Sequence, residues 1–202
     1  MNKRNAEILL IAVIILRSTS YLFSKIGLAT LPPLEILAIR FFLSFLILSL
    51  IFYNHLHRTV TKPLLRSAAN LGAILFACMA CELISLTTID SSMVSFLENT
   101  AVAWVPLILA VKNRALPNKS TSICTLVIVC GIGLLTLNTT EFHLSSGELI
   151  CLCGSVCYAF WIIKTTKEAR RFDPLSLGIT QFFFLTLYST AGTFLFEKIG
   201  RA

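Results

Sequence analysis

The sequence predicts an all-α fold, a polytopic bundle of transmembrane helices, from three observations. Of the 202 residues, 56% are hydrophobic and 13% are charged, whereas about 25% of residues in soluble domains are charged. The mean hydropathy is +0.83. Runs such as LLIAVIIL and ICTLVIVCGIGLLTL are apolar on every face, unlike the alternating strands of membrane β-barrels. The lipid bilayer is therefore the first expected partner.

Seven spans follow when the chain is cut at polar clusters, Pro and Gly, with about 20 residues for each span. The first follows Lys3 and Arg4 and lacks a signal-peptide cleavage pattern, so it is expected to remain in the protein. The short connections favour neighbouring antiparallel helices. The expected spans are 7–28, 34–53, 68–88, 91–111, 120–137, 147–166 and 175–196.

Lysine and arginine predict the orientation, because cytoplasmic loops retain them. Twelve lie at the ends assigned to the cytoplasm and three on the other side, while the loops TTIDSS and NTTEFHLSSGE contain neither. We therefore expect a multi-pass protein of the plasma (inner) membrane with its N-terminus in the cytoplasm. The net charge of +7 is spread over four cytoplasmic ends without an aromatic-interleaved patch, so nucleic acid is not an expected partner.

Metal, cofactor and enzyme chemistry find little support. The seven cysteines all lie in apolar runs, where a thiol packs as a small hydrophobe. Cys78 and Cys81 form a CxxC, but no second pair or histidine stands at zinc-ligand spacing. The chain has no GxSxG, no HExxH and no paired aspartates in adjacent spans. We expect no metal, no cofactor and no enzyme activity, and we expect His55 and His57 to be solvated.

An internal repeat appears when the sequence is shifted by 141 residues. The shift aligns Glu7 with Glu148, Pro33-Leu34 with Pro174-Leu175, Phe41-Phe42 with Phe182-Phe183, and Arg40 with Gln181. Spans six and seven thus look like a second copy of spans one and two. A unit of five helices would insert its second copy in the opposite orientation, an inverted repeat with the substrate site between the copies. The expected domains are a first repeat, 1–138, and an incomplete second repeat, 139–202.

Four ionisable side chains lie inside expected spans: Arg17, Arg40, Glu82 and Glu98. Each costs roughly 3 kcal/mol to insert, so such groups are expected to face the bundle interior and to be paired. Glu98 shares a polar helix face with Ser95 and Asn99, and Pro106 is expected to kink the same span. We predict a substrate-binding site formed by Arg40, Glu82, Ser95, Glu98, Asn99, Tyr158, Trp161 and Gln181.

Within this site Glu98 is the expected coupling group, a carboxyl that exchanges a proton as the cavity changes sides. A small-molecule solute coupled to protons is therefore an expected partner. Two structural alternatives stay open. Ser95 and Trp161 could serve helix packing or membrane anchoring, and an Arg–Glu pair could serve assembly without touching a ligand.

The stretch SYLFSKIGLATLPPLEILAIRFFLSFLIL resembles the first two spans of EamA-type carriers in the drug/metabolite transporter superfamily, and SSMVSFLENTAVAWVPLILA resembles their fourth. Gly131-Ile132-Gly133 and GELICLCGSVCYAFWIIKTTK are similar to their fifth and sixth spans. The resemblance implies ten helices in two inverted halves, a membrane permease that moves small metabolites, amino acids or drug-like solutes by alternating access.

The chain departs from that family at three points. Arg17-Ser18 stands where the family usually has Trp-Gly, and Asn113 stands where it usually has an acidic residue. The expected spans stop at seven, so three helices of the second half are missing from the expected bundle. The alternative function is therefore a non-transporting truncated fragment, or a structural membrane partner that completes another half-bundle, including a second copy of itself as a homo-oligomer.

Overall fold

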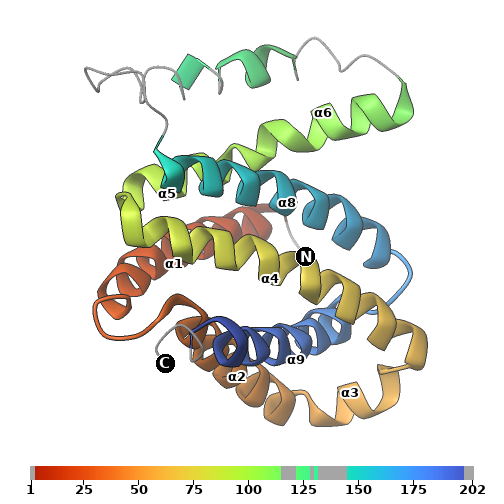
Figure 1. Cartoon of the computed structure of the whole chain (residues 1–202). Helices are drawn as coiled ribbons and strands as arrows, with labels where there is room; N and C mark the ends of the chain where they lie inside the picture. The colour runs from red at the N-terminus through yellow and green to blue at the C-terminus, as the bar shows by residue number, and fades with distance from the viewer. Residues whose placement is uncertain (1–2, 115–121, 128–129, 132–144, 198–202) are drawn as a thin grey trace.

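The computed structural model describes residues 3–114, 122–127, 130–131 and 145–197. Within these ranges all regular structure is helical, which confirms the predicted all-α class. The elements are α1 (Lys3–Gly27), α2 (Pro33–Ile51), α3 (Tyr53–Thr59), α4 (Lys62–Thr88), α5 (Ser91–Asn99), α6 (Ala101–Asn113), α8 (Ser146–Glu168) and α9 (Pro174–Gly192), followed by the π-helical turn Thr193–Glu197 (Figure 1).

Four helical segments in the described ranges are long and apolar enough to cross a membrane: Pro33–Ile51, Lys62–Thr88, Ser91–Asn113 and Ser146–Glu168. Each matches an expected span. That α1 and α9 also span the membrane stays a prediction, although α9 has the same length as α2, 19 residues, and packs along it. Most of the expected fifth span, the boundary between the two expected domains and the side chain of Arg17 lie outside what the structure describes.

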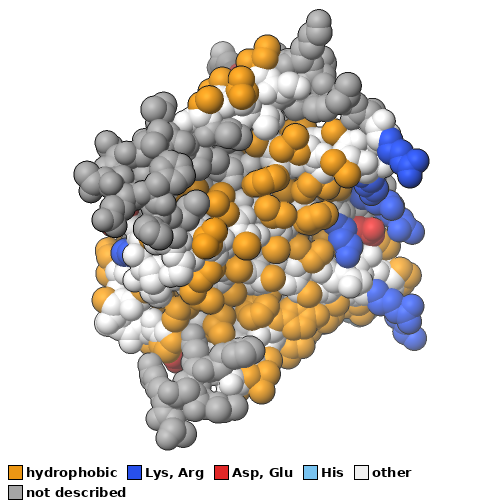
Figure 2. Space-filling model, turned by 45° about the horizontal axis from the view of Figure 1, so that its top comes forward, with side chains coloured by type: hydrophobic (Ala, Val, Ile, Leu, Met, Phe, Trp, Pro, Cys, Tyr) orange, Lys and Arg blue, Asp and Glu red, His pale blue; other side chains and the backbone are white. Residues whose placement is uncertain are grey.

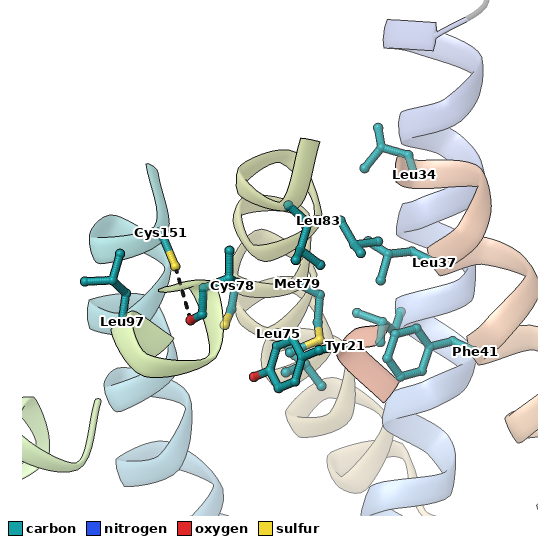
Figure 3. Packing of buried hydrophobic residues seen from close by; sticks show 13 residues of the cluster. Tyr21, Leu34, Leu37, Phe41, Leu75, Cys78, Met79, Leu83, Leu97 and Cys151 are labelled. Atoms are coloured by element: carbon teal, nitrogen blue, oxygen red, sulfur yellow. Dashed lines mark hydrogen bonds between the residues drawn. The ribbon is translucent and has the colours of Figure 1, made fainter. Parts of the chain in front are cut away.

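Helix α4 is the centre of the bundle, because it packs against both α8 and α9. Its buried side chains Leu75, Met79 and Leu83 face residues of α1 and α2 in the main apolar core. Figure 3 shows this core, with Tyr21 of α1 lying beside Leu75 and Met79 and with Phe41 of α2 to their right. Burial of one such helix among its neighbours explains why its apolar residues occupy more than one face.

Small residues allow α4 to approach its neighbours closely. A Cβ atom added to Gly154 of α8 would lie 2.9 Å from the Cβ of Cys81 in α4, closer than real Cβ atoms pack. A Cβ on Gly72 of α4 would lie 3.0 Å from the Cβ of Phe184 in α9. Membrane helices associate through such close packing, because lipid offers no hydrophobic driving force between them.

Helix α8 runs antiparallel to α1. Lys25, near the C-terminus of α1, donates hydrogen bonds to the carbonyl oxygens of Leu86 and Ile89 at the end of α4 (2.5 and 2.8 Å). Gly147, at the start of α8, packs against Thr88 and Ile89 at the same end. The C-terminus of α1 and the N-terminus of α8 thus lie at one end of the bundle, so α8 points the other way.

The same relation holds for α2 and α9, because Gly192 near the end of α9 packs on Leu34 near the start of α2. The shift of 141 residues reproduces the helix bounds. Gly27 and Glu168 end α1 and α8, Pro33 and Pro174 begin α2 and α9, and Ile51 and Gly192 end them. Two residues aligned by the shift also touch: the rings of Phe41 and Phe182 are 5.5 Å apart between centroids.

The expected kink in the fourth span lies at a different residue. The helix is interrupted at Thr100, between α5 and α6, and Pro106 lies inside α6. The Thr100 hydroxyl donates to the carbonyl oxygen of Leu97 (2.5 Å) and to Ser155 of α8 (3.1 Å). A threonine bonded back to its own helix bends it, and a proline disturbs the turn that precedes it, so the break falls before Pro106 rather than at it.

Basic side chains gather at one end of the bundle, next to a broad hydrophobic surface (Figure 2). At this end the unexpected short helix α3 carries His55, which we expected to be solvated. His55 is exposed, as expected, and its Nε2 also lies 2.9 Å from Oδ2 of Asp173, the residue that caps α9. The hydrogen bond from His55, followed by that from the backbone N–H of Ser176, holds the pKa of Asp173 below its usual value.

Replacing Asp173 by asparagine is expected to lower the melting temperature by a few degrees at pH 7 and by progressively less as the pH falls into the acid range. A depressed carboxyl pKa contributes stability above the unfolded pKa of about 3.9 and loses it as the pH falls through the folded value. Asparagine keeps the helix cap. Thermal unfolding in detergent measures the difference. Asp90→Asn is the control, because Asp90 begins α5 without a side-chain cap bond; an equal effect at both positions would contradict the assignment.

Candidate functional site

A buried tyrosine–carboxylate pair joins α1 to α5. The Tyr21 hydroxyl donates a hydrogen bond to Oε2 of Glu98, whose residue is only 3% exposed. Glu98 is buried because α5 turns the face that carries Val94, Leu97 and Glu98 into the bundle. A buried carboxylate needs donors to offset its lost hydration, and the Tyr21 hydroxyl is one of them.

Beside this pair lies a hollow of about 450 Å³ between α1, α2, α4 and α8. This volume is in the range of small-molecule sites in proteins. Most of its wall is apolar, with a few polar groups from different helices. Its polar and aromatic lining consists of Ser20, Tyr21, Arg40, Phe41, Glu82, Tyr158 and Trp161.

The two charged groups of the hollow come from facing helices. Glu82 of α4 is 8% exposed, and Arg40 of α2 is exposed at the rim, with its Cζ 5.5 Å from the ring centroid of Phe41. Both are ionisable side chains in a wall that is otherwise largely apolar. A solute bearing an anionic and a cationic group could therefore meet a partner for each.

An aromatic platform forms the α8 side of the hollow. Tyr158 and Trp161 stack with ring centroids 5.3 Å apart and an interplanar angle of 7°. The Trp161 indole nitrogen is buried and has no hydrogen-bond acceptor within the described residues. Buried indole N–H groups usually find an acceptor, so this donor could bind a polar solute atom.

The structure brings together only part of the predicted set. Arg40, Glu82, Tyr158 and Trp161 line the hollow, and Glu98 is joined to it through Tyr21. Asn99 is exposed, and its Nδ2 donates to the carbonyl oxygen of Ser95 (2.7 Å) within α5, so neither residue lines the hollow. Gln181 is buried in α9 and does not line the hollow. Its backbone carbonyl oxygen lies close to Gly72 of α4.

Sequence reasoning missed the contribution of α1. Ser20 and Tyr21 line the hollow, but neither belongs to the predicted set. A signal was present, because the stretch RSTSY, 17–21, is a polar interruption of the first apolar run. In a membrane helix such an interruption marks a face turned toward protein rather than lipid.

These features suit reversible binding better than bond-making chemistry. The hollow offers charge, an aromatic surface and hydrogen-bond donors from several helices, and its carboxyl groups lie at depths where lipid would surround the protein. Ionisable groups at such depths mark solute or ion pathways.

Comparison with known proteins agrees with this geometry. A family model described as the EamA-like transporter family matches residues 4–137, well over half of the chain. No match was found among curated proteins or among solved structures. The matched range contains α1 to α6, and with them Tyr21, Glu82 and Glu98. The chain therefore belongs to the EamA-like transporter family, whose members are membrane transporters rather than enzymes.

Proposed function

We propose that the chain moves a small polar or amphipathic solute across the membrane by alternating access and binds it in the hollow between α1, α2, α4 and α8. One observation carries the proposal: the buried carboxylate of Glu82, the guanidinium of Arg40 and the Tyr158–Trp161 stack meet at one hollow of about 450 Å³. Opposite charges beside an aromatic surface suit a small metabolite, an amino acid or a drug-like solute.

In this proposal Glu98 couples transport to protons. Burial disfavours a charged carboxyl unless donors satisfy it, and Tyr21, which donates to Glu98, also lines the hollow. A solute that displaces the Tyr21 hydroxyl removes a donor from Glu98 and makes the carboxyl bind a proton more readily. Release of the solute restores the donor and releases the proton.

The opposite directions of α1 and α8, and of α2 and α9, support an inverted repeat with 1–138 as the first unit and 139–202 as part of the second. In such repeats the site lies between the two units, and here α8 contributes one wall of the hollow. The basic end of the bundle supports a cytoplasmic N-terminus in the plasma membrane.

The test uses the full chain in proteoliposomes loaded with a pH-sensitive dye. Single amino acids and organic cations are added in turn, and internal pH and radiolabelled solute are followed at several external pH values. We expect wild-type protein to move at least one solute together with protons. Glu98→Gln should abolish the pH dependence of uptake, because an amide cannot carry a proton.

Asn99→Asp is the matched control, because Asn99 is the neighbouring residue but exposed. It should leave pH-dependent uptake unchanged. Transport by Glu98→Gln with an unchanged pH dependence would refute the coupling role. Uptake that is unaffected by Glu82→Gln and Trp161→Ala together would refute the binding site itself.

A second candidate function is a structural membrane partner, favoured by the uncovered face of α1. Leu16, Phe23 and Ile26 are each about 70% exposed there. If another bundle or a second copy covers this face, single cysteines at Phe23 or Ile26, which lie outside the hollow, will cross-link between chains in membranes when introduced into a cysteine-free variant. Cross-links at these positions without solute uptake would favour the structural role over transport.

A further inference from the structure

Two adjoining hollows flank α8 near the basic end of the bundle, and none of their lining residues lines the proposed solute site. One, of about 370 Å³, lies between α6 and α8 and is lined by Val105, Leu109, Ile162 and Arg170 among others. The other, of about 540 Å³, lies between α4, α6 and α8 and is lined by Ile74, Lys112, Phe160 and Lys164 among others. Ile163 and Lys167 line both.

Helix geometry explains this division. Ile163 and Lys167 are four residues apart and form one ridge on α8. Residues 160 and 164 lie on the α4 side of the ridge, and residues 162, 166 and 170 lie on the α6 side. Each hollow is thus an apolar groove that ends in basic side chains, and the ridge separates the two grooves.

The charge at the mouth of the grooves is strongly positive. Lys112, Lys164, Lys167 and Arg170 line it, against one carboxylate, Glu168. The Glu168 carboxylate is already engaged. Its Oε2 accepts from the Ser67 hydroxyl at 2.9 Å, and its Oε1 lies 3.8 Å from a guanidinium nitrogen of Arg171. The four basic groups therefore give the mouth of the grooves an excess of positive charge that can bind an anion.

We propose that this double groove binds one anionic glycerophospholipid of the surrounding membrane. The phosphate lies among Lys112, Lys164, Lys167 and Arg170, and one acyl chain lies on each side of the Ile163–Lys167 ridge. Two features identify this occupant. Basic groups between helices on the cytoplasmic side bind anionic headgroups, and the side of the molecule shown in Figure 2 places basic side chains at the border of a broad hydrophobic surface. A free phosphate would use the charge and leave both apolar grooves unfilled.

The experiment compares two lipids on the full chain in detergent. Dioleoyl phosphatidylglycerol is the probe, dioleoyl phosphatidylcholine has the same chains without net charge, and native mass spectrometry counts the lipid bound at each concentration. We expect one phosphatidylglycerol to bind more tightly than phosphatidylcholine. The triple variant K164Q/K167Q/R170Q should weaken that lipid by roughly tenfold or more, since each basic group contributes substantially to anionic lipid binding.

A matched control neutralises three exposed charges elsewhere at the same end, R58Q/K62Q/R66Q, and should change the affinity less than about twofold. The chain sites are tested by Leu109→Trp, which fills the α6 groove, against Leu43→Trp on an exposed face of α2. Of these two variants, only Leu109→Trp should weaken the binding of both lipids. Thermal unfolding without added lipid checks that each variant is folded.

Equal binding of the two lipids, or equal loss in both triple variants, would overturn the proposal, because the charge would then act non-specifically. An unchanged affinity in Leu109→Trp would overturn the placement of the acyl chain.

Discussion

Gly154→Ala will destabilise the protein by about 1–3 kcal/mol, as expected when a methyl group is forced into a packed contact. The new Cβ would lie 2.9 Å from the Cβ of Cys81, an atom fixed by the α4 backbone rather than the end of a flexible side chain. Helices α4 and α8 must therefore move apart, and the core between them loses contacts. Denaturant titration in detergent micelles measures the free energy of unfolding.

Gly178→Ala is the matched control, because a Cβ at Gly178 of α9 would have nothing within 4 Å. It should be neutral or stabilising by about 0.5–1 kcal/mol, since alanine is the better helix former. Cys81→Gly should rescue Gly154→Ala by removing the opposing Cβ. Equal stability changes in the two alanine variants, or no rescue, would show that the α4–α8 contact is looser than described.

Tyr21→Phe will cost about 1–3 kcal/mol, because it removes a donor from a carboxylate that is almost fully buried. The phenyl ring keeps its packing against α4, so the loss reports the hydrogen bond. Combining it with Glu98→Gln completes a double-mutant cycle, and the two changes should be less than additive. Thermal and denaturant unfolding of the four proteins give the coupling energy.

The control for that cycle is Tyr188→Phe. The Tyr188 hydroxyl lies 3.4 Å from the carbonyl oxygen of Ala69, a long hydrogen bond on the α9 side. Its loss should cost less than about 0.5 kcal/mol and should be additive with Glu98→Gln. Full additivity between Tyr21→Phe and Glu98→Gln would mean that the two side chains do not stabilise each other.

Composition and apolar run length predicted the helices well, because a span must satisfy every backbone group within itself and must match the bilayer thickness. Helices α2, α8 and α9 begin within two residues of the starts that we expected for these spans, and they end within four residues of the expected ends. Charge clusters predicted which loops share one end of the bundle. The repeat inferred from the 141-residue shift stays a prediction, and the starts of α2 and α9 are 141 residues apart.

Tertiary packing decided what the sequence could not. Glu98 and Asn99 are adjacent, so their side chains point about 100° apart on a helix, and the packing of α5 against α1, α4 and α8 determines which of them is buried. At the break, Thr100 also contacts Ser155 of α8, which is 55 residues away in the sequence. Helix α3 has no apolar run that would predict it from the sequence, and it is held to α9 through His55 and Asp173.

The matched second helices of the hairpins α1–α2 and α8–α9 restrict how this chain can change, because α2 and α9 are both 19 residues long. The turn within each hairpin, 28–32 between α1 and α2 and 169–173 between α8 and α9, also has the same length. One inserted residue after Phe41 would rotate the rest of α2 by about 100° and carry Phe45 away from Phe183, whose ring centroids are now 5.2 Å apart. An insertion or a deletion within α2 or α9 therefore displaces every contact beyond it, whereas a substitution changes the contacts of a single residue.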